Sequence, residues 1–303
     1  MDNKSLIKYY KSFYECKVFH TRLISNSKVA HIMFTYDYAK EFENFSKTFL
    51  MYLPYYVRNY DQLSTISEEN IDDELIKRSK VVRVDRIIPQ RRVEVDGLYG
   101  ELFLDFYLRI VCEKNSLITY AQKRNFLSNE ESRGPDNVTY FIENEKINVC
   151  FCEAKFVGGA TNAKINLIDD INGTISGKPS HISKDFLNNY IGFMISQGLN
   201  ISEKDKKLFS SFIRDLNSKL DASNNFIDSL IYFDICCNFI FFAIFDSTRK
   251  KPDELKKHYD EIYENAEKRI KELKLLNYKI EIVFVPTNSE PINIKKEIVK
   301  EYE

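Results

Sequence analysis

Two runs of alternating apolar residues, 138–142 and 147–151, limit the folds open to this chain more than any other segment. Alternation with a period of two is typical of β-strands, and two such runs this close together predict an antiparallel hairpin. With a turn at 144–145, the register places Asp136 opposite Glu153. Asn-Glu is a poorer two-residue turn than Asn-Gly, and a slip of one residue would turn every side chain to the other face. The register of this hairpin therefore decides which charges meet.

Three charged residues gather at one end of this hairpin, namely Asp136, Glu153 and Lys155. Strand alternation places all three on one face. Directly opposed carboxylates repel each other unless a cation lies between them, and a hard divalent ion bound by carboxylate oxygens supplies that charge. Lys155 is then placed to neutralise a phosphate or to hold an attacking water. The pattern predicts a metal-dependent nuclease centre, and its alternative is a solvent-facing ion pair of Glu153 with Lys155.

Periodicity places further elements around the hairpin. From residue 97 a helical pattern runs to about residue 113, with Glu101 in its second turn. We expect Glu101 either to reach the metal site or to be an acid favoured by the helix dipole, and the residues leave both open. The later elements are strands at 116–126, 139–143 and 146–156, a helix capped by Thr161, a central strand within 229–246, a helix from Pro252 and a strand at 279–285. This order predicts an α/β fold in which a mixed sheet is flanked by helices.

The N-terminal region has a different pattern. Strand-like runs at 15–24 and 28–36 precede a helix from Tyr38 that we expect to end at Pro54, and a second helix is expected from Ser67 to about Ser79. Residues 81–95 combine strand-like residues with a basic cluster and are interpreted as a connector. We therefore divide the chain into an α+β accessory region, residues 1–90, and a second unit, residues 91–303.

Composition restricts the classes of function. The chain has 303 residues, and its 44 basic and 45 acidic residues give a net charge of −1, so any contact with DNA must come from a local patch. Its 6 cysteines include no CxxC pair, which argues against a zinc site or a disulfide framework. The N-terminus lacks an apolar signal region, and the longest apolar run, Phe239 to Phe245, is too short to cross a bilayer. We expect a cytoplasmic protein with no membrane partner.

A family resemblance rests on these residues in this order. Glu101 lies on the leading helix, Gly134-Pro135-Asp136 precedes the second strand, and Glu153-Ala154-Lys155 lies on the third. The set resembles the PD-(D/E)xK nuclease superfamily and, more narrowly, the HamA family of nuclease subunits from the Hachiman anti-phage defence system. Ala154 stands where that family usually has Ser, and alternation directs it away from the catalytic face. The resemblance covers roughly residues 90–290 and implies a restriction-endonuclease-like core.

The resemblance also implies an activity and partners. It implies a Mg²⁺-dependent deoxyribonuclease, with Mn²⁺ as a substitute, in which Asp136, Glu153 and Glu101 hold the metal and Lys155 acts beside it. It further implies a partner helicase of superfamily 2, HamB-like, that restrains the nuclease. We expect the accessory region to be the docking surface for this partner. Candidate DNA contacts after the catalytic strand are Lys164, Lys178, His181 and Lys184. Two alternatives stay open: a catalytically silent DNA-binding or regulatory subunit on a nuclease scaffold, and a site-specific restriction endonuclease.

Overall fold

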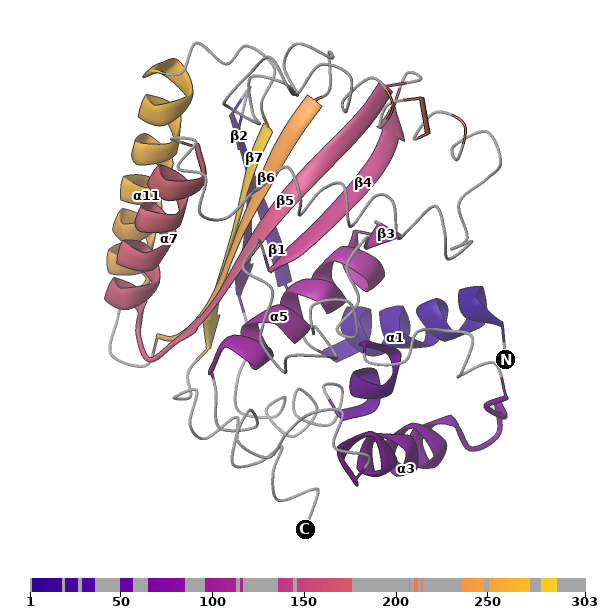
Figure 1. Cartoon of the computed structure of the whole chain (residues 1–303). Helices are drawn as coiled ribbons and strands as arrows, with labels where there is room; N and C mark the ends of the chain where they lie inside the picture. The colour runs from indigo at the N-terminus through magenta and orange to yellow at the C-terminus, as the bar shows by residue number, and fades with distance from the viewer. Residues whose placement is uncertain are drawn as a thin grey trace.

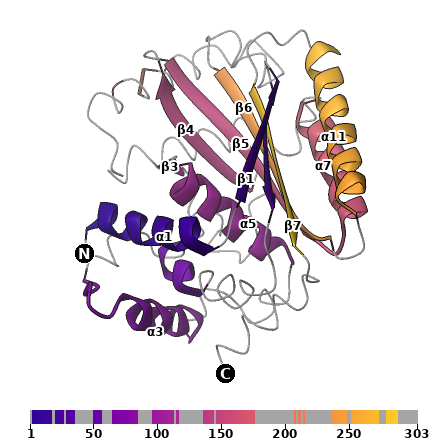
Figure 2. The same cartoon turned by 180° about the vertical axis from the view of Figure 1, so that it is seen from behind.

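The structure is a computed structural model in which helices cover one β-sheet (Figure 1, and from behind in Figure 2). It describes residues 2–17, 20–26, 29–35, 50–56, 65–84, 96–112, 115–116, 136–143, 146–175, 207, 210–211, 214, 236–247, 251–272 and 279–287. Among them, no helix has the length and apolar character needed to cross a membrane.

The sheet has seven strands in the order β1-β2-β7-β6-β5-β4-β3. Parallel pairing joins β2, β7, β6 and β5, whereas β1 with β2, β5 with β4 and β4 with β3 are antiparallel. The predicted mixed sheet is therefore confirmed. The strands are β1 (His20–Asn26), β2 (Val29–Thr35), β3 (Asn115–Ser116), β4 (Asn137–Glu143), β5 (Lys146–Val157), β6 (Cys236–Asp246) and β7 (Lys279–Thr287).

The central strand is the one that the apolar run predicts. β6 occupies the middle position of the seven, and every residue from Asn238 to Asp246 is buried. A strand covered on both faces reads as a nearly continuous apolar run because neither set of side chains meets water. The strand begins at Cys236, and the earlier residues of the predicted range, 229–235, lie outside the described part of the chain.

Helices cover both faces of the sheet. On one face lie α7 (Ala160–Ile175) and α11 (Pro252–Glu272), and on the other lies α5 (Asp96–Phe106), which continues as the π-helix η2 (Tyr107–Val111) (Figure 1). Alternate residues of β5 divide between these layers. Phe156 stacks against Tyr99 and Phe103 of α5, whereas Lys155 pairs with Asp170 of α7. The two faces of β5 thus have separate partners.

The α5 layer also holds the N-terminal helices. Helix α1 (Asn3–Lys17) and the helical residues 50–56 bury Tyr10, Met51 and Tyr52 in the same core as α5. Strands β1 and β2 extend the common sheet through the pairing of β2 with β7. The proposed boundary near residue 90 lies within residues 85–95, outside the described residues, so the division into accessory and nuclease units stays a prediction.

The hairpin register is confirmed. Ile142 pairs with Ile147 and Val138 with Phe151, as a turn at 144–145 requires. Residues 144–145 themselves are outside the described residues. The apolar period of two therefore sufficed to fix the pairing, although Asn-Glu is a weak turn sequence.

Three local predictions in the N-terminal region are wrong. Glu15 to Lys17 belong to α1 and not to a strand, and residues 81–84 end the helix α3 (Ile71–Val84), which begins after Ser67 and carries an acidic first turn. The helix expected to end at Pro54 continues through Tyr56. Proline lacks the amide hydrogen that a helix interior needs. Here the burial of Leu53, Tyr55 and Tyr56 on both sides of the proline stabilises the helix in compensation.

The predicted helix cap at Thr161 is also wrong. The amide of Ala163 donates to the carbonyl of Gly159 at 3.0 Å, so α7 begins at Ala160 and Thr161 is an exposed residue of its first turn. The inward stripe of this helix is confirmed at Ala163, Leu167 and Ile171, which are fully buried. The stripe fixes which face of α7 lies on the sheet.

Candidate active site

The candidate site lies where β5 extends past β4. The β4–β5 pairing ends at Asn137 and Cys152, whereas β5 continues beside β6 to Val157. Asp136 is the residue immediately before β4, and its Oδ2 accepts a hydrogen bond of 2.7 Å from the amide of Ala154. The carboxylate of Asp136 therefore lies against the backbone of the Glu153-Ala154-Lys155 segment. Two of the predicted acids come together as the register requires.

Lys155 is the cation of this cluster. Its ammonium lies 2.9 Å from the carboxylate of Asp170 on α7, and the two side chains are 27% and 21% exposed. Burial of Lys155 opposes its charged form, but the negative charges of Asp170, Glu153 and Asp136 outweigh this and raise the pKa of the lysine above its ordinary value. Lys155 is therefore a protonated group surrounded by three carboxylates.

Asp170 is the site residue that the sequence reasoning missed. It lies seven residues after Ala163 and three after Leu167, which are fully buried, so helical periodicity directs it toward the sheet. A carboxylate on an inward-facing stripe requires a partner, because an unpaired buried charge is unstable. That signal was present in the sequence, and Lys155 is the partner.

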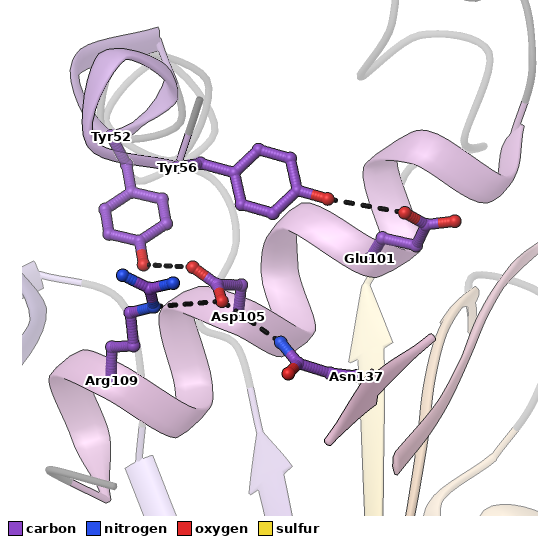
Figure 3. A network of polar contacts seen from close by, with 6 residues as sticks. All are labelled: Tyr52, Tyr56, Glu101, Asp105, Arg109 and Asn137. Carbon is purple, nitrogen blue, oxygen red and sulfur yellow. Dashed lines mark hydrogen bonds and ion pairs between the residues drawn. The ribbon is translucent and has the colours of Figure 1, made fainter. Parts of the chain in front are cut away.

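Glu101 approaches the same stretch of β5 from the other layer. Its neighbour Gly100 packs so closely that an added Cβ would lie 3.5 Å from atoms of Ala154, Lys155 and Phe156. Glu101 itself accepts a hydrogen bond of 3.3 Å from the hydroxyl of Tyr56 (Figure 3). The structure thus brings Glu101 alongside the Glu153-Ala154-Lys155 segment but on the opposite face of the sheet from Lys155. Its role as a metal ligand stays a prediction.

A sequence profile described as HamA matches residues 9–302, nearly the whole chain. The chain belongs to the HamA family. None of the curated proteins matches it significantly. HamA membership gives the chain a role in the Hachiman anti-phage defence system. The match includes the N-terminal region as well as the segment on which the resemblance was based.

The donor atoms of this HamA site suit a hard cation. Asp136 and Glu153 offer carboxylate oxygens beside the same backbone segment, and Mg²⁺ is commonly held by one or two carboxylates together with water and substrate phosphates. The amide of Ala154 occupies one oxygen of Asp136, which leaves Oδ1 for a metal. Within the described residues, no group of three or more His, Cys, Asp or Glu side chains could hold an ion by itself. The fit therefore depends on water and phosphate to complete the shell.

The candidate DNA contacts of this HamA chain divide into two groups. Lys164 forms an ion pair with Glu261 of α11, which ties α7 to its neighbouring helix. Lys178, His181 and Lys184 lie outside the described residues. Contact of any of the four with DNA stays a prediction.

The ion pair between Lys155 and Asp170 can be tested by removing the charge of Asp170. In Asp170→Asn, the pKa of Lys155 falls below its wild-type value, because burial then opposes the charged form with less compensation. Titration of the Lys155 side chain by NMR measures the shift directly. The matched control is Asp169→Asn, an exposed neighbour on the same helix. If both variants titrate like the wild type, Asp170 is not the group that holds the charge of Lys155.

The raised pKa of Lys155 also predicts how the stability of the fold depends on pH. The folded-state pKa of Lys155 lies above its ordinary value of 10.5, which describes the unfolded chain. The contribution of the pair to stability is therefore fully present below pH 10.5 and is lost as the pH rises through the raised pKa. Across the neutral range, Lys155 contributes a constant positive charge.

Proposed function

We propose that this HamA chain is a metal-dependent DNA endonuclease, the effector that hydrolyses phosphodiester bonds in anti-phage defence. The observation that carries the proposal is the cluster at the end of β5, where Asp136 and Glu153 lie beside a protonated Lys155. Two acids that can hold a divalent ion next to a fixed cation are suited to a phosphodiester, whose charge increases in the transition state.

The order of elements supports the same proposal. Helix α5, the antiparallel strands β3, β4 and β5, helix α7 and the parallel strand β6 follow one another in the order expected of a PD-(D/E)xK core. Glu101 lies on α5, Asp136 directly precedes β4 and Glu153 lies on β5, in the order that the PD-(D/E)xK resemblance implies. Ala154 is buried against Gly100 on α5, which agrees with the prediction that it points away from the face that carries Glu153 and Lys155.

The roles of the residues follow from their charges. We assign Asp136 and Glu153 to holding one or two Mg²⁺ ions, with Mn²⁺ as a substitute. A bound ion supplies positive charge to the phosphate and lowers the pKa of its water. Lys155 is protonated, so it donates hydrogen bonds and charge to a phosphate oxygen and does not remove a proton. Asp170 holds its ammonium in place. Glu101 is assigned to the same centre from α5.

The partners follow from the Hachiman system. We propose that a HamB-like helicase of superfamily 2 binds the N-terminal region, residues 1–90, and restrains the nuclease until foreign or damaged DNA releases it. Tyr56 belongs to that region and donates a hydrogen bond to Glu101. A displacement of the N-terminal region on helicase binding would therefore alter the position of the Glu101 side chain. We place the complex in the cytoplasm, where phage DNA is replicated.

The proposal is tested with the purified full chain, alone and with its helicase. Supercoiled and linear DNA are incubated with Mg²⁺, with Mn²⁺ and with a chelator, beside Glu153→Ala and Lys155→Ala. We expect metal-dependent nicking that both substitutions abolish. Cleavage that persists in both variants would place the activity elsewhere. If the wild type binds DNA but never cuts it, with or without the helicase, the chain is a silent regulatory subunit. Cutting at one fixed sequence would indicate a restriction endonuclease.

A further inference from the structure

A buried acid lies between the N-terminal helices and the candidate site. Asp105 of α5 is completely buried and is one helical turn after Glu101. Figure 3 shows both side chains with the polar groups around them. A carboxylate without contact to water is costly to keep charged unless it is fully hydrogen-bonded. The hydrogen-bond donors around Asp105 therefore indicate the role of this buried carboxylate.

Asp105 receives hydrogen bonds from three separate segments. The hydroxyl of Tyr52 donates to Oδ2 at 2.6 Å, Nε of Arg109 to Oδ1 at 3.1 Å, and Nδ2 of Asn137 to Oδ1 at 3.0 Å. Burial and the adjacent charge of Asp105 raise the pKa of Tyr52, which keeps its hydroxyl a donor. Burial opposes the charge of Arg109, but Asp105 together with Tyr52 and Tyr55 outweighs it, and the pKa of Arg109 is raised. These partners are the helical residues 50–56, the π-helix η2 and strand β4.

The third partner is adjacent in sequence to a site residue. Asn137 is the first residue of β4 and is 2% exposed, and its amide points into the α5 layer. Asp136 precedes it and bonds the amide of Ala154 on β5. The start of β4 is thus held at two points by consecutive side chains. One bond reaches across the strand pair, and the other reaches the helix that covers it.

We propose that Asp105 is a positioning residue of the candidate active site, which fixes Asp136 through Asn137. The inference rests on the proposed function. Within the described residues the β4–β5 pairing ends at Asn137, so no strand pairing seen there between β4 and β5 holds Asp136 in place. The bond from Asn137 to Asp105 supplies that restraint. Because a displacement of about 1 Å at a reacting group reduces rates by about 100-fold, loss of the restraint is felt in catalysis.

The probe for this role is Asn137→Leu. Replacement of Asp105 itself leaves the charge of Arg109 unpaired and endangers the fold, whereas Asn137→Leu keeps the bonds of Asp105 to Tyr52 and Arg109. The control is Asn148→Leu, a buried asparagine of β5 opposite Phe141, at the other end of the hairpin. Asn137→Ala is a second probe, because it removes the donor and adds no bulk to the buried site.

Two measurements on the full-length protein separate positioning from simple stability. Amide hydrogen exchange reports the bond from Ala154 to Asp136. In both Asn137 variants we expect Ala154 to exchange about tenfold faster relative to Glu153, whose amide points to the opposite side of the strand. The Mn²⁺ affinity of the chain, and the Mg²⁺ concentration that half-saturates cleavage, should weaken by about tenfold or more. Asn148→Leu should change neither.

Each outcome decides a different claim. Unchanged relative exchange at Ala154 in both Asn137 variants would overturn the positioning role, even if cleavage fell. Equal effects in Asn148→Leu would overturn it as well, since any buried asparagine would then do the same. If the wild type neither binds Mn²⁺ nor cuts DNA, the proposed function fails. The exchange result then still decides whether Asp105 holds Asp136 in place.

Discussion

Glu153→Gln should reduce Mg²⁺-dependent DNA cleavage by about 10³-fold, the scale of loss when a group that stabilises transition-state charge is removed. The amide has the size of the carboxylate but carries no charge for a metal ion. The fold should survive, because Glu153 is only partly buried. Initial rates on supercoiled DNA at saturating Mg²⁺, together with thermal unfolding curves, measure the two effects separately.

Glu264, an exposed residue of α11, offers a matched control. Glu264→Gln makes the same chemical change at an exposed position of that helix, and it should leave the rate unchanged. If both glutamine variants lose activity to the same extent, the loss is a general charge effect. The assignment of Glu153 to metal binding would then be abandoned.

Asp105→Ala should destabilise the folded state by about 3–5 kcal/mol, because it leaves the charge of Arg109 buried without its carboxylate. The side chains of Asp105 and Arg109 are 0% and 12% exposed, so water cannot replace the lost partner. The hydroxyl of Tyr52 loses its acceptor at the same time. Urea denaturation with a fitted midpoint and slope gives the change in the free energy of unfolding.

The double variant Asp105→Leu/Arg109→Met is the control for this prediction. Replacing both charges by apolar side chains of similar volume removes the buried charge, so most of the lost stability should return. Cleavage should nevertheless stay low, because Asn137 lacks its acceptor in both variants. If Asp105→Ala costs less than about 1 kcal/mol, the scale of an ordinary hydrogen bond, Arg109 is not dependent on Asp105.

The sequence predicted the parts of the site that depend on local periodicity. The alternation in β4 and β5 set the pairing, and the pairing brought Asp136 to the Glu153-Ala154-Lys155 segment. The continuous apolar run of β6 predicted the central strand for the same reason. Where spacing along one strand or hairpin decides the geometry, the residues alone suffice.

The remainder depends on packing between distant segments. Nothing near Asp105 in the sequence indicates that Tyr52 and Asn137 donate to it, since 53 and 32 residues separate them. The persistence of helix beyond Pro54 likewise depends on tyrosines that find their partners on α5. Local propensity cannot encode such contacts, because tertiary burial stabilises conformations that the isolated segment would not favour.

The pairing of β2 with β7 determines how the N-terminal region can be studied. Removal of residues 1–90 would strip two strands from the sheet and leave the backbone of β7 as an open edge, and exposed edges recruit other chains and aggregate. It would also remove the tyrosines that cover α5. Failure of a truncated chain to bind the helicase would thus reflect its aggregation and not the loss of a docking surface. Binding of the proposed helicase is better tested by single substitutions of exposed residues on α3, such as Asp73.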